Sequence, residues 1–472
     1  MDADRENNDD HGRGCVHPAS GAYRWIALGF MCVLSFGSYF CYDNPAALED
    51  NIIADMAVSN TQYALLYSVY SWPNVIVPFF GGFLIDRLFG VRLSGVLFSA
   101  FIMAGQLVFA AGALLDSFFI MVVGRAVFAL GGENLAVCQN NYAVKWFIGR
   151  ELNTALGVQL SFARLGSSIN LYIMKPLHSL VRESFGFSGN RSLGITLLIG
   201  GLSTVVSVLS GVILWRMDWR NDKHKQSRVS SAPSNVDASE TLEDADWSPL
   251  LRRDSEPEAP IRLTDALRFP PSYWLLCLIC VAYYVCVFPL VGFGLLFFES
   301  KFGLSPYPWS EVCNSLIYFI SIIACAPCGV LVDRFGRNAG WMLVAVLVTA
   351  VGHALLAFTF VTPFVAMTLI GVSYSLLASS LWPAVAYVVP QRLTGTAYGI
   401  MQAIQNLGMA VFFWTAGLLL DARGYFALEL YFLMFLSVAL TATIVLILYD
   451  WSQDGPLTKS TQSLLQLEKK SS

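Results

Sequence analysis

The sequence predicts an all-α membrane protein in which twelve transmembrane helices form two six-helix bundles. Of its 472 residues, 56% are hydrophobic and only 13% are charged, whereas a soluble chain carries about 25% charged residues. The mean hydropathy is +0.57. Apolar stretches long enough to cross a bilayer recur along the chain, and two motifs appear once in each half. Together these observations favour a duplicated bundle of membrane helices.

The composition excludes several classes of protein. A soluble enzyme or a disordered scaffold needs far more polar surface than this chain offers. A net charge of −4 without a basic stripe argues against nucleic-acid binding. Two C-x-x-C pairs, Cys277/Cys280 and Cys325/Cys328, have no histidine near them in sequence. We interpret the cysteines as small apolar side chains inside helices, so no metal or other cofactor is expected.

The expected spans fall into two groups of six, separated by a polar gap. A run of about 20 apolar residues crosses a bilayer as a helix. The expected spans are 23–42, 61–85, 93–115, 117–142, 152–175 and 193–215 in the first half, and 271–297, 311–332, 339–360, 362–389, 394–420 and 425–449 in the second.

The chain is thus divided into five segments. An N-terminal tail (1–22) precedes the first bundle (23–216), a linker (217–268) precedes the second bundle (269–450), and a C-terminal tail (451–472) follows. The linker is rich in Ser, Pro, Asp and Glu and cannot bury a core, so we predict that it is disordered. An even number of spans places both tails on one side. Basic residues concentrate in the linker and the loops on its side, which predicts that this side is cytosolic.

An Asp-Arg turn follows the second span and recurs after the eighth. The first copy contains Asp86 and Arg87, and the second contains Asp333, Arg334 and Arg337. A tight glycine turn of this kind lets an Asp reach nearby backbone N–H groups or an arginine across a gate. We therefore assign these residues to gating rather than to substrate binding.

A second match supports an internal duplication. The stretch from Thr154 to Gly166 corresponds to the stretch from Thr396 to Gly408, in the same order relative to the Asp-Arg turns. Two collinear matches predict two copies of a six-helix unit related by an axis along the membrane normal. This arrangement is similar to that of major facilitator transporters.

Ionisable side chains within the spans are few. Such residues are costly to bury and mark function by default. Arg125 belongs to a Gly-Arg motif common in this kind of transporter. We expect His353 to be a hydrogen-bonded core histidine and Glu429, near the start of the last span, to reach water. The functional candidates are therefore Glu133 and Arg164.

Glu133 and Arg164 are expected at the same depth. They lie about 14 residues before and about 16 residues after the turn that joins their spans, which places both roughly 21–24 Å from it. One interpretation is a structural salt bridge. The other is a split site in which Glu133 binds a cationic group and Arg164 an anionic one, because the planar guanidinium suits a carboxylate. Both hold if the pair closes on itself when the site is empty.

Other polar and aromatic side chains in the apolar spans complete the candidate substrate site. Each alone is more often a packing residue or an interface anchor. These candidates are Tyr39, Gln139, Tyr142, Tyr284, Trp382, Gln402, Gln405 and Asn406.

Several long strings resemble one family, the lysosomal dipeptide transporters known as major facilitator superfamily domain-containing protein 1. The resemblance covers about 22–450. Its strings are FGSYFCYDNP at 36–45, YSWPN at 70–74, GGE at 131–133, ARLG at 163–166, LWP at 381–383 and the polar stretch 395–408.

The resemblance implies a uniporter that exports dipeptides of broad side-chain range from the lysosome. It also implies that Glu133 holds the peptide amine, that Arg164 holds the carboxylate, and that a glycosylated single-pass accessory subunit binds the transporter. The E-x-x-E-R pattern of proton-coupled peptide transporters is absent from the first span, which favours uniport. Two alternatives remain open: a proton-coupled transporter of another small organic anion or zwitterion, and a non-transporting membrane scaffold or sensor.

Lysosomal targeting is expected to reside in the linker. The N-terminal tail, where the family carries its dileucine signal, contains no leucine. The linker instead holds an acidic dileucine pattern, Asp246 with Leu250 and Leu251, which we expect to bind adaptor proteins. Asn190 lies in a glycosylation sequon on the lumenal side. We therefore expect a multi-pass lysosomal membrane protein with both termini cytosolic.

Overall fold

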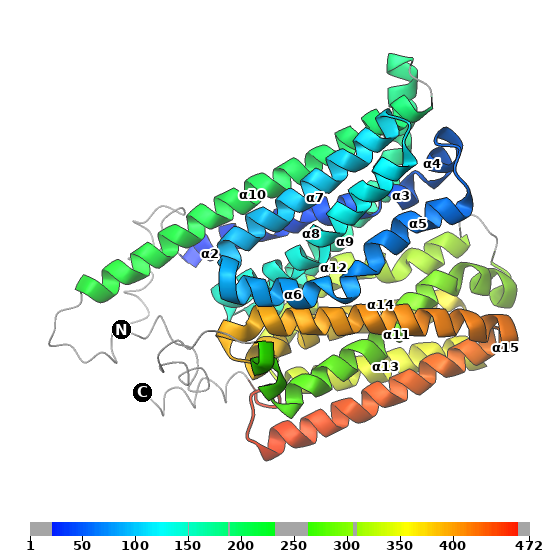
Figure 1. The fold of residues 1–472 in the computed structure, drawn as a ribbon. Helices are drawn as coiled ribbons and strands as arrows, with labels where there is room; N and C mark the ends of the chain where they lie inside the picture. The colour runs from blue at the N-terminus through cyan, green and yellow to red at the C-terminus, as the bar shows by residue number, and fades with distance from the viewer. Residues whose placement is uncertain (1–20, 150, 187–188, 232–262, 305–308, 461–472) are drawn as a thin grey trace.

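The computed structural model describes residues 21–149, 151–186, 189–231, 263–304 and 309–460. These residues form helices and turns, and there is no strand among them. Figure 1 shows two layers of long helices, with the first half of the chain above the second. Within the described ranges, nine helices are long and apolar enough to cross a membrane.

The helices follow the predicted ranges closely. The first half contains α2 (Gly21–Tyr42), α3 (Asn44–Ala47), α4 (Glu49–Asp55), α5 (Asn60–Ser71), η1 (Pro73–Val75), α6 (Val77–Leu84), η2 (Ile85–Phe89), α7 (Gly90–Leu114), α8 (Phe118–Phe147), α9 (Leu152–Phe185) and α10 (Asn190–Ser231). The second half contains η4 (Leu263–Arg268), α11 (Pro271–Phe302), α12 (Glu311–Phe335), α13 (Asn338–Phe358), α14 (Pro363–Val388), η6 (Gln391–Leu393) and α15 (Thr394–Ser452).

The second predicted span is broken, and the break lies beside the candidate site. Pro73 and Pro78 interrupt it because proline lacks the N–H that a helix needs. The side chain of Asn74 donates to the carbonyl oxygen of Tyr70 at 3.0 Å and so satisfies a group that the break leaves free. A broken helix is tolerated at membrane depth where the protein satisfies its backbone in this way.

The difference between twelve predicted spans and nine apolar helices has three sources. The broken second span contributes α6 to a continuous stretch with α7. Helix α9 is long, but its polar side chains keep it out of the nine. The last two predicted spans both lie in α15, where the chain reverses at Gly424 with a φ of 77°. All twelve predicted ranges are nevertheless helical over most of their length.

The two halves meet through equivalent pairs of helices, α9 on α12 and α6 on α15. Both contacts require glycine. A Cβ at Gly157 would lie 2.4 Å from the carbonyl oxygen of Cys325, and a Cβ at Gly399 would lie 2.2 Å from that of Pro78. Gly157 and Gly399 occupy matching positions of the internal repeat, so the duplicated units use the same backbone contact twice.

The beginning of the predicted linker is helical, because α10 continues through 217–231. A buried acid holds this extension to the first bundle. The carboxylate of Asp218 accepts hydrogen bonds from Arg92 at 2.5 Å, Lys145 at 2.7 Å and Trp146 at 3.1 Å. The helix therefore starts the linker as a rigid extension of the bundle.

Several predictions fall on parts of the chain that the structure does not describe. The remainder of the linker lies outside the described residues, and with it the predicted sorting motif of Asp246, Leu250 and Leu251. Residues 1–20 of the predicted N-terminal tail lie outside them as well.

Glu429 does not reach water, so that expectation is wrong. Its side chain is 2% exposed, and its Oε2 lies 2.8 Å from Nδ1 of His353, whose side chain is 0% exposed. Helix α13 packs on α15 and brings the two residues together, and the ring of Phe432 lies against His353. The expectation that His353 is a hydrogen-bonded core histidine is confirmed.

The His353–Glu429 pair should stabilise the second bundle. His353→Leu should lower the thermal unfolding temperature of the purified protein in detergent, because an unpaired buried carboxylate costs about 3–5 kcal/mol. The double variant His353→Leu/Glu429→Leu should recover most of that loss, since two apolar side chains then replace the pair. A double variant no more stable than the single one would contradict this account.

Candidate functional site

Glu133 projects from α8 toward the break in the second span. It is half-buried. The hydroxyl of Tyr70, near the end of α5, donates to its Oε1 at 3.2 Å. Among the described residues, Tyr70 is the partner of this carboxylate, and Oε2 has none. One oxygen is therefore held and the other is free for a ligand.

Arg164 projects from α9 into an aromatic wall supplied by the second half. Its Nη2 donates to the hydroxyl of Tyr374 at 2.5 Å. The guanidinium lies 5.1 Å from the ring centroid of Tyr318, 5.7 Å from that of Tyr374 and 5.8 Å from that of Phe288. Rings at this distance attract a cation. Within the described part of the chain, its Nε group is buried without a partner.

Glu133 and Arg164 do not pair with each other. No ion pair within 4.0 Å joins them among those of the described residues, and each has its own tyrosine partner. The salt-bridge interpretation therefore does not hold in this structure. Tyr39, a further predicted site residue, lies in α2 and is half-buried.

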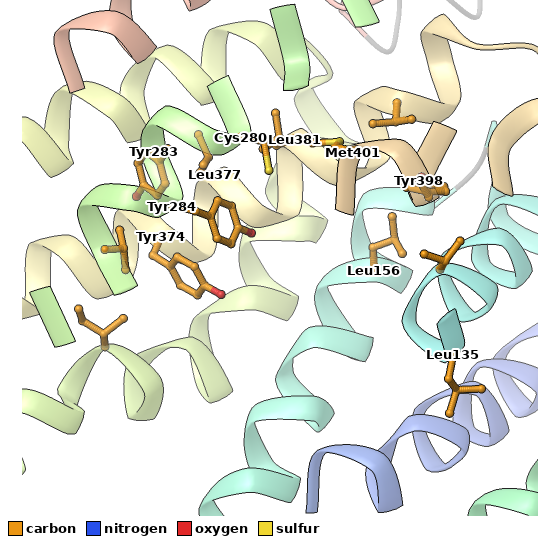
Figure 2. Close-up of a cluster of buried hydrophobic side chains, with 14 of the residues drawn as sticks. Leu135, Leu156, Cys280, Tyr283, Tyr284, Tyr374, Leu377, Leu381, Tyr398 and Met401 are labelled. Carbon is orange, nitrogen blue, oxygen red and sulfur yellow. The ribbon is translucent and has the colours of Figure 1, made fainter. Parts of the chain in front are cut away.

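Two further predicted residues join the Arg164 side of the site. Nε1 of Trp382 donates to the hydroxyl of Tyr284 at 2.9 Å, and the ring of Tyr284 packs against that of Tyr374 with centroids 5.9 Å apart. Figure 2 shows Tyr284 and Tyr374 side by side with their hydroxyls turned in a similar direction. The second half thus contributes a continuous aromatic surface next to Arg164.

Two of the three polar candidates on α15 make contacts with other helices. The side chain of Asn406 donates to the carbonyl oxygen of Asn74 at 2.8 Å and so ties α15 to the break in the second span. Gln402 lies one helical turn earlier and is half-buried. Gln405 is 9% exposed and accepts from the thiol of Cys280 at 3.7 Å, which makes it a packing residue.

Two of the α8 candidates lie away from the charges. Tyr142 is 0% exposed and its ring packs closely against Gly95 of α7. It follows Glu133 by nine positions, or roughly 14 Å along the helix. Gln139 donates to the carbonyl oxygen of Met31 at 3.1 Å. Both residues fasten α8 to its neighbours, and the structure does not bring them to the site.

The aromatic partners of the two charges were not among the predicted site residues. Tyr70, Tyr318, Tyr374 and Phe288 lie in apolar runs, where an aromatic side chain is normally a packing residue. The depth of these side chains within the predicted spans was the signal that could have identified them. Tyr374 stands near the middle of its predicted span, far from the interfaces where tyrosine normally anchors a helix.

The two repeated aspartates, Asp86 and Asp333, connect the halves, and we name their contacts the aspartate clasp. Asp86 accepts from the N–H groups of Gly395 and Thr396 at 3.0 and 2.6 Å. Asp333 accepts from the N–H groups of Asn153 and Thr154 at 3.1 and 2.7 Å. These donors lie in the first turns of α15 and α9, so each aspartate caps a helix of the other half, where free N–H groups and the helix dipole favour an anion.

The arginines of the repeated motif lie close to their own helices. The guanidinium of Arg87 lies 5.5 Å from the ring of Phe83, and that of Arg334 lies 5.9 Å from the ring of Phe335. Arg337 takes a positive φ of 57° at the start of α13. The aspartates therefore make the contact between halves, and the arginines flank it.

Comparison with known proteins defines the class. The family model of the Major Facilitator Superfamily matches residues 28–413 and 315–464. The crystal structure of the transporter FucP in the outward conformation superposes with a TM-score of 0.69 at 14% identity, covering 90% of this chain and 99% of that one. The chain shares its fold with these membrane transporters.

Closer relatives define the family. The lysosomal dipeptide transporter MFSD1 of Danio rerio is 45% identical over 466 residues, which cover 98% of this chain and 95% of the relative. The protein of the same name from Homo sapiens is 45% identical over 447 residues, covering 94% and 90%. This chain therefore belongs to the MFSD1 family of the major facilitator superfamily, whose members are transporters and not enzymes.

Removal of the aspartate clasp should open this end of the molecule. In Asp86→Ala/Asp333→Ala, the first N–H groups of α15 and α9 lose their acceptors. Cys325 is fully buried where α12 meets α9, so we expect it to react about tenfold faster with a thiol reagent, which corresponds to roughly 1.4 kcal/mol of opening. Mass spectrometry would measure the labelling of each cysteine.

Cys286 provides the control for this labelling. It is buried inside the second bundle and donates to the carbonyl oxygen of Phe432 at 3.2 Å, so opening between the halves should leave its reactivity unchanged. Equal labelling of Cys325 in the wild type and the variant would show that the aspartates do not hold the halves together.

Proposed function

We propose that the protein is a dipeptide uniporter that exports dipeptides from the lysosomal lumen to the cytosol by alternating access. The supporting observation is the pair of opposite charges that lie half-buried and do not neutralise each other. Unpaired charges inside a membrane are costly, and a zwitterion with separated ends would compensate both. Relatives of about 45% identity that carry the name lysosomal dipeptide transporter support the same substrate.

In this proposal, Glu133 binds the peptide amine and Arg164 binds the carboxylate. Oε2 of Glu133 is free to accept from an ammonium group. The guanidinium of Arg164 has N–H groups beyond the one that Tyr374 uses, and its planar fork can hold both oxygens of a carboxylate. Tyr39 of α2 would face the middle of the substrate.

The aromatic surface accounts for a broad range of substrate side chains. Phe288, Tyr318 and Trp382 surround the Arg164 side of the site. Contact with aromatic rings is largely non-directional, so side chains of different shape can gain from it. Specificity would then come from the two charged ends and not from the side chains.

The clasp of Asp86 and Asp333 suggests how access alternates. It closes the end of the molecule that we assign to the cytosol, together with both termini. Release of the two capped helices would let the halves rock and open this end. Because the two caps are equivalent, one rocking motion breaks both.

Partners and targeting follow from the family assignment. We propose that a glycosylated single-pass subunit binds the lumenal face and that adaptor proteins read the Asp246–Leu250–Leu251 motif. Asn190 is the first residue of α10 and is half-buried. A glycan on Asn190 would therefore have to point away from this end of the helix.

Loss of either charge should abolish transport. Glu133→Ala and Arg164→Ala should each reduce uptake of neutral dipeptides at least about 100-fold, since each removes a charge-assisted contact with the substrate. Uptake into cells that express the protein at the plasma membrane would measure this. Asp50→Ala and Lys175→Ala are matched controls, because these residues form an exposed ion pair and Lys175 follows Arg164 by eleven positions, or roughly 16 Å along α9. Normal transport by both charge variants would refute the assignment.

The proposal of uniport predicts that the dipeptide gradient alone drives transport. Dipeptide flux into liposomes that contain the purified protein should run down its own gradient, and a pH gradient should not produce uphill accumulation. This measurement separates the uniporter from a proton-coupled transporter, for which an imposed gradient would drive accumulation.

A further inference from the structure

Arg125 is a deeply buried charge of the first bundle, and the proposed substrate contacts do not use it. Its side chain is 1% exposed. Its Nη2 donates to the carbonyl oxygen of Tyr42 at 3.2 Å. Five aromatic rings surround the guanidinium and form what we name the Arg125 cage: Phe128 at 5.3 Å, Tyr70 at 5.5 Å, Tyr42 at 5.6 Å, and Tyr67 and Phe109 at 5.9 Å.

The cage fixes the position of the Tyr70 ring. Tyr70 packs edge-on against Tyr42 with centroids 4.8 Å apart, and it packs against Phe128 at 6.1 Å. Cation–π contacts strengthen when the cation is removed from water. The ring of Tyr70 is therefore held on one side by Arg125 and on the others by aromatic neighbours.

The opposite end of Tyr70 reaches Glu133 only because residue 132 is glycine. A Cβ at Gly132 would lie 2.6 Å from the hydroxyl oxygen of Tyr70, a distance at which one of them must move. That same hydroxyl donates to Oε1 of Glu133 at 3.2 Å. A connected series of contacts thus runs from the Arg125 cage through Tyr70, past Gly132, to the carboxylate of Glu133.

We propose that Arg125 and Gly132 are positioning residues, which together hold the Tyr70 hydroxyl on Oε1 of Glu133 so that Oε2 faces the substrate amine. This inference rests on the proposed function, because it assumes that Glu133 binds the amine. A carboxylate with one oxygen held cannot rotate freely, and a fixed acceptor binds its ligand with less ordering cost.

Tyr70→Phe and Gly132→Ala test the two contacts of the Tyr70 hydroxyl, one with Glu133 and one with residue 132. Each should raise the KM for neutral dipeptides about tenfold and leave the maximal rate within about twofold, because one charge-assisted hydrogen bond is lost before the substrate binds. In the Tyr70→Phe background, Gly132→Ala should have a smaller effect, since the oxygen that the new methyl would meet is gone. Fully additive effects would contradict a shared contact.

Two control variants make the same chemical changes, loss of a tyrosine hydroxyl and addition of a methyl group to a glycine, elsewhere in the first bundle. Tyr23→Phe removes a buried hydroxyl that donates to the carbonyl oxygen of Met217 in the same bundle. Gly29→Ala adds a methyl group where no atom lies within 4 Å. Both should leave the KM unchanged.

Arg125→Lys tests the cage itself. Lysine keeps the charge but loses the planar group that the rings surround, so the KM should rise as it does in Tyr70→Phe. In the Tyr70→Phe/Arg125→Lys double variant, the rise should not exceed that of the larger single change. If Arg125→Lys fails to fold, Tyr70→Phe and Gly132→Ala still decide the proposal.

A comparison of ligands separates positioning from general damage. Inhibition of uptake should be measured with a neutral dipeptide and with its analogue that lacks the amine but keeps the carboxylate. Tyr70→Phe, Gly132→Ala and Arg125→Lys should weaken the dipeptide about tenfold and leave the analogue unchanged. Equal weakening of both ligands would overturn the proposal, because a distorted site would lose both.

The same experiment distinguishes this inference from the proposed function. If Glu133→Ala abolishes uptake while the three positioning variants behave as wild type, the positioning role is refuted and the proposed function stands. If Glu133→Ala transports neutral dipeptides normally, the proposed function itself is refuted.

Discussion

Two opposite charges held apart in an apolar interior are the constraint on which the rest of the structure depends. Glu133 and Arg164 lie on neighbouring helices of the first bundle, yet each is satisfied by a different tyrosine. Charges of opposite sign attract strongly where the dielectric is low, so their separation has to be built into the scaffold. The broken second span, the Tyr70 contact and the aromatic wall of the second half together maintain it.

The proposed gate is symmetric, whereas the proposed substrate site is not. Asp86 and Asp333 cap equivalent helices of the opposite halves, as gene duplication would produce. Glu133 and Arg164, in contrast, both belong to the first half. Tyr70 of the same half contacts Glu133, and aromatic side chains of the second half contact Arg164. Symmetry suits a gate in which two bundles rock about one axis, whereas a substrate with two different ends requires asymmetry.

The sequence predicted the helices and the repeat, because hydropathy and motif spacing are local properties. It also drew attention to Glu133 and Arg164, because a charge within a span is costly. It did not predict how the charges are satisfied. Tyr70 and Tyr374 look like packing residues in a linear sequence, and Tyr142 looks as suitable as either. Glu429 was expected in water, since only the packing of α13 on α15 reveals His353 beside it. Contacts between distant helices decide these matters.

In the proposed mechanism, Arg164 takes part both in substrate binding and in the contact between the halves. It belongs to the first half, but Tyr374, Tyr318 and Phe288 of the second half surround it. A rocking motion of the halves must therefore change its environment. In the proposed mechanism, a carboxylate binds the N–H groups of the guanidinium that Tyr374 leaves free. Its binding energy can then shift the balance between the two conformations only as far as Arg164 holds it more tightly in one arrangement of the halves than in the other.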